Sequence, residues 1–291
     1  RVVHGAEAFR RPQIIDKKVI KRIKECEKLA PLHNPVNLAG IIGCKKIIPK
    51  ITQVAMFDTA FYQTIPPHAY MYALPYTYYK KHGVRKYGFH GTSHQFVAQA
   101  AARRLKKPLN KLKLITCHLG NGCSITAIDR GKSIDTSMGF TPLEGLIMGT
   151  RSGDIDVAAV FYIMEKEGLS LKEMDSILNK RSGLLGVSRV SNDMRVIKEK
   201  AKKNNRLALL ALEMFIYRIK KYIGAYYLIL GGVDAVVFTA GIGENNPDII
   251  KRLKNQMYKI MPKKTKVLAI PTDEELMIAT LTYNTVRRVK R

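Results

Sequence analysis

The chain of 291 residues carries 50 Lys and Arg against 23 Asp and Glu, a formal net charge of +27, and 46% of its residues are hydrophobic. This length suffices for one large domain or two modest ones with a sizeable core. No apolar run reaches the roughly 18 residues of a membrane helix, and no apolar stretch typical of a signal peptide opens the sequence. Since the first residue is not Met, we expect a processed chain or a fragment.

The charge would attract anions generally, namely nucleotides, acyl phosphates, nucleic acid or an acidic membrane surface. The basic excess lies in four helix-like stretches, at 17–24, 103–113, 198–206 and 251–266. A solvated helix face is the simplest interpretation of each. The cysteines at 26, 44, 117 and 123 have neither CxxC spacing nor a histidine at zinc distance. We therefore expect buried free thiols in a reducing cytoplasm.

The first quarter of the chain combines one basic amphipathic segment with one short strand. Residues 14–29 alternate apolar and basic residues at helical spacing, and residues 33–35, His-Asn-Pro, break that pattern. Residues 53–57 are typical of a short buried strand that carries Asp58 at its C-terminal end. The turn-rich segment 64–68 follows and indicates a boundary between two lobes.

The remaining three quarters alternate between strand and helix patterns. The predicted helices cover 95–105, with its start marked at 91–93, then 155–166, 171–178, 207–230, 246–259 and a last one from residue 273. The predicted strands cover 113–117, 123–128, 133–136, 235–238 and 267–270, with a hairpin turn at 129–131. This pattern predicts an α/β protein with glycine-rich loops at strand ends, where phosphate sites are usually found.

Two glycine-rich loops follow apolar strands. Gly120-Asn121-Gly122 is by itself best explained as a hairpin connection, although glycines also let backbone N–H groups close around a phosphate. Residues 241–246, GIGENN, join a strand to a helix whose free N–H groups and positive dipole end would face an anion. They are not a Rossmann fingerprint because no third glycine follows, and Lys132-Ser133 fails as a Walker loop because the upstream glycine position is Thr126.

Charged and histidine side chains near helix starts are the other candidates. Arg151 precedes Ser-Gly-Asp, and its guanidinium would suit a transferring phosphoryl group, or Asp154 would simply cap a helix. His90 and His94 are four residues apart, but a helix start between them and the lack of a third ligand argue against zinc. Each could equally be a structural histidine. Asp58 could orient a catalytic group or cap the next turn.

Seven segments, in order along the chain, together resemble acetate kinases. They are 57–61 (FDTAF), 87–94 (YGFHGTSH), 117–122 (CHLGNG), 135–145 (DTSMGFTPLEG), 148–154 (MGTRSGD), 237–245 (VFTAGIGEN) and 270–276 (IPTDEEL). Motifs of this length at consistent spacing are far more specific than any single short motif. The resemblance runs from Arg1 to the last predicted helix.

The resemblance implies the fold of the acetate and sugar kinase, heat-shock ATPase and actin superfamily, usually in a homodimer. This fold is α/β, with two ribonuclease-H-like lobes around a cleft. We expect residues 1–62 to form an incomplete N-terminal lobe on the acetate side and residues 63–275 to form the nucleotide-binding lobe. Residues 276–291 would be a final helix that returns to the N-terminal lobe.

The resemblance also implies roles for matching residues. Arg1 and Arg151 would flank the acetate carboxylate and the transferring phosphoryl group. His90 would donate a hydrogen bond to that group, and Asp58 would orient the arginines or the acetate. The small apolar pocket for the methyl group would consist of Val3, Leu32, Phe89 and Pro142.

The nucleotide and metal sites are implied in the same way. The phosphates would contact His118, Leu119, Gly120, Asn121 and Gly122. The adenosine would contact Asp193, Met194, Arg195, Gly241, Ile242, Gly243, Glu244 and Asn245. Glu274 would support Mg²⁺, or alternatively Mn²⁺, through water, with ATP and ADP as substrates. Acetate is already an anion at neutral pH, so the task is to bring two anions together and neutralise the charge between them.

The sequence departs from the family in a few places. The family begins upstream of the position of Arg1 with a strand and an Asn-Ala-Gly-Ser-Ser-Ser phosphate loop. Both are absent here, so we expect weak or no activity from this chain. The stretch 258–267 is shorter than usual. Ala6 replaces a usual glycine, Arg189 a small residue, and Met194 an aromatic one near the adenine.

The predicted function is therefore reversible transfer of the ATP γ-phosphoryl group to acetate, in the cytoplasm, as a step of acetyl-CoA biosynthesis and without a membrane partner. Two alternatives stay open. The chain could be a propionate or butyrate kinase of the same family, because one methylene is worth only about 1–3 kcal/mol to an apolar pocket. It could also be a non-catalytic basic nucleic-acid binder, although it has no recognisable RNA or DNA motif.

Overall fold

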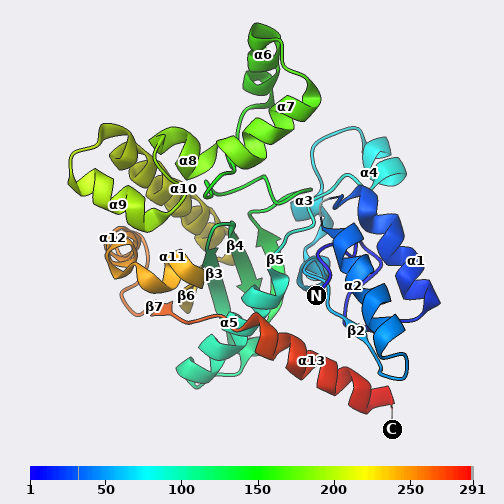
Figure 1. Cartoon of the computed structure of the whole chain (residues 1–291). Helices are drawn as coiled ribbons and strands as arrows, with labels where there is room; N and C mark the ends of the chain where they lie inside the picture. Colours follow the sequence, from blue (N-terminus) through cyan, green and yellow to red (C-terminus); the bar gives the residue numbers. More distant parts are fainter. Residues whose placement is uncertain (32, 290–291) are drawn as a thin grey trace.

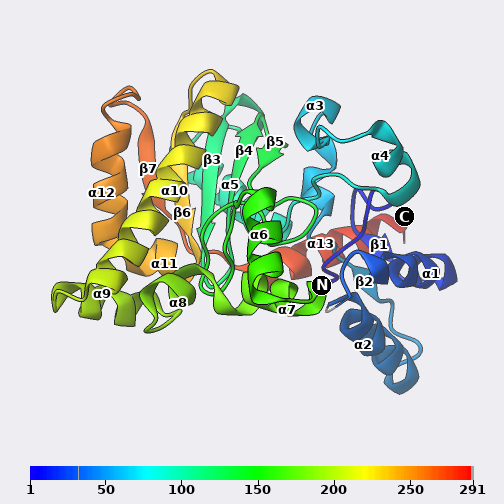
Figure 2. The same cartoon turned by 90° about the horizontal axis from the view of Figure 1, so that it is seen from above.

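The computed structural model describes residues 1–31 and 33–289, in which a five-stranded sheet carries most of the helices and a smaller group of elements holds the N-terminus (Figures 1 and 2). The strands are β1 Gln13–Ile14, β2 Val54–Ala55, β3 Lys113–Leu119, β4 Cys123–Asp129, β5 Lys132–Thr136, β6 Ala235–Thr239 and β7 Lys266–Ala269. The α-helices are α1 Lys17–Glu25, α2 Asn34–Ile47, α3 Pro67–Tyr70, α4 Tyr76–His82, α5 Gly91–Leu105, α6 Val157–Glu167, α7 Leu171–Ser176, α8 Gly183–Ser188, α9 Met194–Lys202, α10 Arg206–Leu230, α11 Ala240–Asn245, α12 Pro247–Met257 and α13 Glu274–Val289.

The large sheet has the strand order β5-β4-β3-β6-β7. β3 lies at its centre and pairs antiparallel with β4 and parallel with β6. Because side chains alternate along a strand, Ile115 and Cys117 of β3 join the core on one face, whereas Thr116 and His118 point to α5 on the other. The polar face of β3 therefore lies beneath the start of α5.

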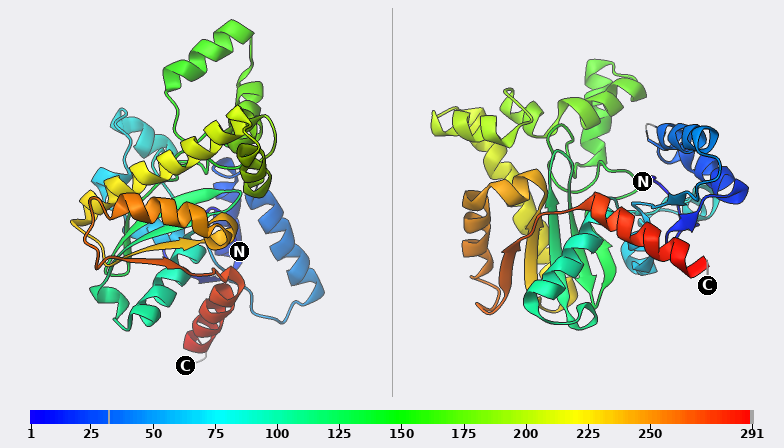
Figure 3. Two further views of the ribbon diagram at one scale, coloured as in Figure 1. Left: turned by 90° about the vertical axis from the view of Figure 1, so that its left-hand side faces the viewer. Right: turned by 60° about the horizontal axis from the view of Figure 1, so that its bottom comes forward.

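Helices cover both faces of this sheet (Figure 3). On one face α10 buries Phe215 and Ile219 against β3 and β4, and the Asn205 side chain caps this helix by accepting from the N–H of Ala208. On the opposite face α5 buries Val97 and Ala101 against β3 and β6. None of the described helices is long and apolar enough to span a membrane.

The N-terminal group is held by less backbone pairing. β1 and β2 pair over two residues each, and Val2 forms an isolated parallel bridge with Phe57. Their small core includes Ile23 of α1 and Leu38 of α2. The last helix, α13, contacts α5, β1 and β2, and so connects the sheet with this group (Figure 1).

Most predicted elements are confirmed to within a few residues, and four expectations were wrong. The first helix begins at Lys17, because residues 13–14 are a strand and Asp16 caps the helix. The His-Asn-Pro segment starts helix α2, since proline is favoured in a first helical turn. Residues 240–245, most of which were expected in a glycine-rich loop, form helix α11, whereas the helix expected at 246–259 is confirmed as α12, Pro247–Met257. Cys44 is exposed, whereas the other three cysteines are buried, and all four are free thiols.

Candidate active site

Three segments that are far apart in sequence meet at one place beside the sheet. The N-terminal residues supply Arg1, the N-terminal cap of α5 supplies His90, and the loop between β5 and α6 supplies Arg151. Gly122, in the turn between β3 and β4, lies between two of them. A Cβ atom there would be 3.3 Å from Nε2 of His90 and 3.4 Å from Nη1 of Arg151. The absence of a side chain at Gly122 therefore keeps open the space that these two groups face.

Arg1 is held by a buried carboxylate. Its Nη2 donates to Oδ2 of Asp58 at 2.6 Å and its Nε to Oδ1 at 2.9 Å, while Nη1 lies 3.4 Å from Oε2 of Glu274. The Asp58 side chain is 2% exposed and that of Arg1 is 41% exposed. The hydrogen bond and charge of Asp58 raise the pKa of Arg1, and burial raises the pKa of Glu274. Asp58 therefore orients Arg1, which lies near enough to His90 for its charge to help lower the pKa of that ring.

Arg151 is a cation that has no acidic partner among the described residues. Its Nη1 donates to the carbonyl oxygen of Pro142 at 3.3 Å and contacts Sδ of Met148 at 3.5 Å. No carboxylate lies within ion-pair distance of it in residues 1–31 and 33–289. Burial lowers the pKa of Arg151, which stays charged at neutral pH. A partly buried guanidinium with no counter-ion is suited to an anionic ligand.

His90 and His118 stack beside each other, with ring centroids 4.2 Å apart. Burial is the main cause that lowers the pKa of both rings, to about 4 for His118 and well below the usual value for His90. Both are therefore neutral at pH 7, and a neutral ring donates from one nitrogen only. Nδ1 of His90 lies 2.9 Å from Oγ of Ser124, which leaves Nε2 for the open space.

A cleft of about 790 Å³ opens beside this cluster. This volume is within the usual range of small-molecule sites. Eight of the predicted nucleotide residues line the cleft: Gly120, Asn121, Asp193, Met194, Arg195, Gly241, Ile242 and Asn245. Asn246, from the predicted GIGENN loop, and Asn192, which the sequence did not single out, line it as well, and Nδ2 of Asn192 donates to Oδ1 of Asn121 at 3.3 Å. Asn192 stands outside the glycine-rich motifs and carries no charge, so no local signal marked it.

The other five predicted nucleotide residues do not line the cleft. Leu119 is buried, and Gly243 packs against Leu119 and Phe238. Oε1 of Glu244 accepts from the backbone N–H groups of Ala240 and Thr272, so it holds the loop together. His118 and Gly122 belong to the histidine and arginine cluster described above.

Three of the four residues predicted for the apolar pocket are among the described residues, and one of them, Pro142, contacts Arg151. Phe89 is buried directly before His90, Pro142 accepts from Arg151, and Val3 packs on the main core. The fourth, Leu32, lies outside the described residues.

Glu274 is the predicted metal residue. Its Oε2 is buried and has no hydrogen-bond partner in the part of the chain that the structure describes, although it lies 3.4 Å from Nη1 of Arg1. Among the described residues no group of three or more His, Cys, Asp or Glu could hold a metal by itself. Mg²⁺ is usually held by one or two carboxylates together with substrate phosphates and water. Glu274 fits that mode of binding as a single hard oxygen ligand.

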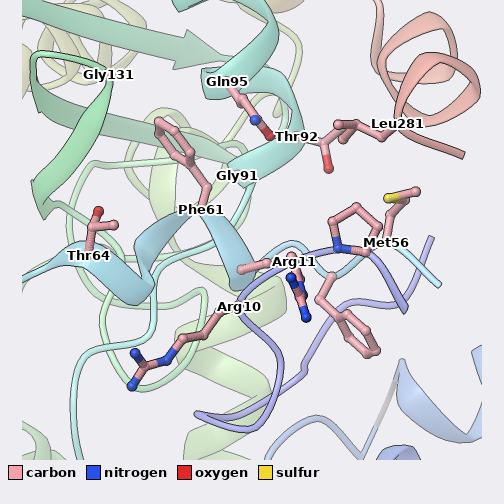
Figure 4. Close-up of a pocket in the computed structure, with 13 residues that line it drawn as sticks. Arg10, Arg11, Met56, Phe61, Thr64, Gly91, Thr92, Gln95, Gly131 and Leu281 are labelled. Atoms are coloured by element: carbon pink, nitrogen blue, oxygen red, sulfur yellow. The ribbon is translucent and has the colours of Figure 1, made fainter. Parts of the chain in front are cut away.

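A second cavity lies where the N-terminal group meets α5 and α13 (Figure 4). Its volume is about 240 Å³, and Arg11, Phe61 and Leu281 are among the residues that line it. None of the predicted site residues lines this cavity. The 790 Å³ cleft is therefore the candidate site for a nucleotide.

Comparison with known proteins bears on this arrangement. Residues 1–262 match the acetokinase family. The acetate kinase of Halothermothrix orenii is 57% identical over 96% of this chain and 75% of its own length, and that of Methanosarcina thermophila is 56% identical over 96% and 73%. The chain belongs to the acetokinase family. It is accordingly a kinase, a phosphotransferase whose acceptor is a carboxyl group.

Solved structures of the acetokinase family agree with the fold. The acetate kinase of Porphyromonas gingivalis superposes with a TM-score of 0.95 and 46% identity, over 98% of this chain and 77% of that one. A propionate kinase from Francisella tularensis gives a TM-score of 0.92, also at 46% identity, over 97% and 77%. The predicted α/β fold of the acetate and sugar kinase superfamily is thus confirmed.

Proposed function

We propose that this acetokinase transfers the γ-phosphoryl group of ATP directly to acetate in a reversible in-line displacement. An acetate oxygen attacks the γ-phosphorus, the bond to the β–γ bridging oxygen breaks, and acetyl phosphate and ADP result. Both substrates are anions, so the protein must neutralise charge and orient them, and needs no strong base.

The observation that carries this proposal is the unpaired Arg151 next to Nε2 of His90. The guanidinium supplies fixed positive charge where the phosphoryl oxygens gather negative charge in the transition state. The neutral imidazole supplies one hydrogen bond, and Arg1, held by Asp58, adds a second positive charge near His90. The apolar side chains of Val3, Phe89 and Pro142 would contact the methyl group.

We propose that Glu274 holds Mg²⁺, which neutralises phosphate charge when it is bound. The chain's own part is to keep Oε2 of Glu274 free of hydrogen bonds and close to Arg1. Mn²⁺ has similar ligand preferences and is expected to substitute.

The test is formation of acetyl phosphate, trapped as the hydroxamate, from ATP, Mg²⁺ and acetate. The relatives are longer than the region that matches this chain. The assay therefore compares this chain with a longer form, extended by the residues encoded immediately upstream of Arg1. We expect the extended form to be faster by orders of magnitude, because an upstream phosphate loop would complete the positioning of ATP. Equal rates for the two forms would remove the loop from the proposal, and no product from either form would overturn the proposed reaction.

The likeness to a propionate kinase favours one alternative, a longer acyl substrate. Rates on acetate, propionate and butyrate separate the two, because one methylene changes kcat/KM by about 10- to 200-fold in an apolar pocket. A preference for acetate supports the first proposal, and a higher kcat/KM on propionate or butyrate overturns it in favour of the second.

We also propose a division of the chain at residues 62/63 and 275/276, with α13 returning to the N-terminal lobe, and a homodimer. Contacts of α13 with β1 and β2 support the division. Exposed apolar side chains on α6 and α10, such as Phe161 and Tyr217, at 63% and 60% exposure, support an interface. A monomer in light scattering at micromolar concentration would contradict the dimer.

A further inference from the structure

A buried chain of hydrogen bonds runs from His90 into the protein. Nδ1 of His90 lies 2.9 Å from Oγ of Ser124, and the same oxygen lies 2.7 Å from Nε2 of His94. Nδ1 of His94 in turn lies 2.7 Å from Oγ1 of Thr116. Ser124, His94 and Thr116 are completely buried. His90 is the member of the chain that reaches the open space beside Arg151.

The fold brings these groups together through two regular elements. His90 caps α5 and His94 lies one turn into the same helix, so both rings point to the sheet beneath. Thr116 of β3 and Ser124 of β4 stand on the face of the sheet that α5 covers. Ser124 is the register partner of His118 across the β3–β4 pair.

The hydrogens in this chain can be arranged in two directions. A third arrangement, in which Oγ of Ser124 accepts from both rings, leaves the Ser124 hydroxyl hydrogen without an acceptor among the described residues and is disfavoured. In the first direction, Thr116 donates to Nδ1 of His94, whose Nε2–H donates to Ser124. The Ser124 hydroxyl then donates to Nδ1 of His90, and the single ring hydrogen of His90 must sit on Nε2. In the second direction every donor is reversed. His90 then carries its hydrogen on Nδ1 and turns a bare lone pair toward the substrate.

Thr116 distinguishes the two directions. In the first, its hydroxyl hydrogen is used by Nδ1 of His94. In the second, Thr116 accepts from His94 and its own hydrogen has no acceptor, because its side chain makes no other hydrogen bond within residues 1–31 and 33–289. An unsatisfied buried donor costs about 1–3 kcal/mol. The first direction is therefore favoured.

We propose that Ser124 is a positioning residue that, with His94 and Thr116 behind it, holds His90 with its hydrogen on Nε2, so that the neutral ring donates to the transferring phosphoryl group. This inference rests on the proposed function for its consequence. The tautomer itself is a property of the free protein. Burial lowers the pKa of both His90 and His94, in agreement with neutral rings.

The first experiment is nitrogen NMR of the free protein with ¹⁵N-labelled histidine. The chain has seven histidines, and two-bond correlations to the ring hydrogens distinguish the two tautomers. We expect His90 and His94 both as Nε2–H tautomers. A His90 hydrogen on Nδ1 would overturn the proposal, whatever the enzyme assay gives.

The same spectrum of the Thr116→Val variant tests the role of Thr116. In this variant the hydroxyl donor that sets the direction is absent, so we expect both His90 tautomers. An unchanged spectrum would contradict the role of Thr116.

The second experiment measures turnover in Ser124→Ala in the most active form of the chain. We expect kcat to fall by about 10- to 100-fold, the scale of losing a hydrogen bond that orients a functional histidine, with both KM values within about 2-fold. The matched control is Ser133→Ala. Ser133 of β5 is also buried, and its hydroxyl has no hydrogen-bond partner among the described residues, so kcat should be unchanged.

An unchanged kcat in a folded Ser124→Ala protein would overturn the proposal. If that variant does not fold, the NMR spectrum of the unsubstituted protein still shows which nitrogen of His90 carries the hydrogen, and so decides whether the proposal holds. A correct tautomer in a protein that has no kinase activity in any form would instead overturn the proposed function.

Discussion

The nucleotide side and the carboxylate side of the site are built in different ways. On the nucleotide side, the 790 Å³ cleft lies at the end of a five-stranded sheet whose strands β3, β4 and β6 are almost completely buried. On the carboxylate side, Arg1 directly precedes a single bridge, Val2 to Phe57, and is oriented by the charge of Asp58. The first side is thus shaped by backbone and packing, whereas the second depends on electrostatics. Substitutions that change charged residues should therefore affect the chemical step and the binding of the carboxylate substrate more than the binding of ATP.

The largest effect is expected for Arg151→Lys. Lysine keeps the charge but loses the planar fork, so a contact made mainly in the transition state is weakened. We expect kcat to fall by about 10²- to 10³-fold with KM for ATP within about 2-fold. Steady-state kinetics check this, and Arg252→Lys, an exposed ion pair with Glu213, is the control that should not change. An equal loss in ATP affinity would move Arg151 to the nucleotide side of the comparison.

The second largest expected effect is a decrease in the free energy of unfolding in mild acid. Burial lowers the pKa of His4 and of His118 from 6.5 to about 4, and lowers that of His90 and His94 well below 6.5. Below pH 6.5 the unfolded chain therefore binds protons that the folded chain does not, and the free energy of unfolding falls as pH falls toward 4. Each such histidine contributes about 1.4 kcal/mol per pH unit within this window.

Urea denaturation between about pH 7.0 and about pH 5.5 measures this slope. Three of the histidines are beside the large sheet, and only His4 is in the N-terminal group. His4→Gln should therefore reduce the slope by about the share of one histidine. Equal stability at both pH values would show that the rings do not stay neutral in the folded protein.

The sequence was sufficient to predict the helices and strands that have a strongly periodic apolar pattern or a clear turn beside them. The helix at 206–230 and the β3–β4–β5 meander could be predicted because their apolar spacing and their glycine turns are local signals. Helix α2 was missed because His-Asn-Pro was interpreted as a break, although proline is equally suited to a first helical turn.

The contacts within the site are not local in sequence. Burial of the thiols of Cys26, Cys117 and Cys123 was predicted correctly. The contact between Ser124 and His90 could not be predicted, because it depends on how β4 packs under α5. The unpaired state of Arg151 likewise depends on which carboxylates lie near it in space. Such facts are set by long-range packing, which spacing along the chain does not contain.

A smaller effect is expected for Asp58→Asn on the carboxylate side. Asparagine keeps the shape of the side chain, but it has no negative charge and only one acceptor oxygen, so it cannot accept both hydrogen bonds from Arg1. Because the Arg1 side chain is 41% exposed, solvent screens part of the interaction, so we expect KM for acetate to rise only about 10-fold. KM for ATP should stay the same. Equal increases in both KM values would mean that Asp58 supports the whole cleft.

The smallest effect concerns backbone strain, and it compares the two regions directly. Ala6 in the N-terminal group and Arg189 after α8 have φ values of 48° and 57°, in the left-handed region that favours glycine. Ala6→Gly and Arg189→Gly should each raise the free energy of unfolding by about 0.5–1 kcal/mol, as read from urea midpoints. Ala100→Gly, within helix α5, is the opposite control and should lower it by about 1 kcal/mol. A gain at Arg189 without one at Ala6 would mean that the N-terminal backbone does not keep this conformation in solution, and so that the carboxylate side is held less firmly than the sheet.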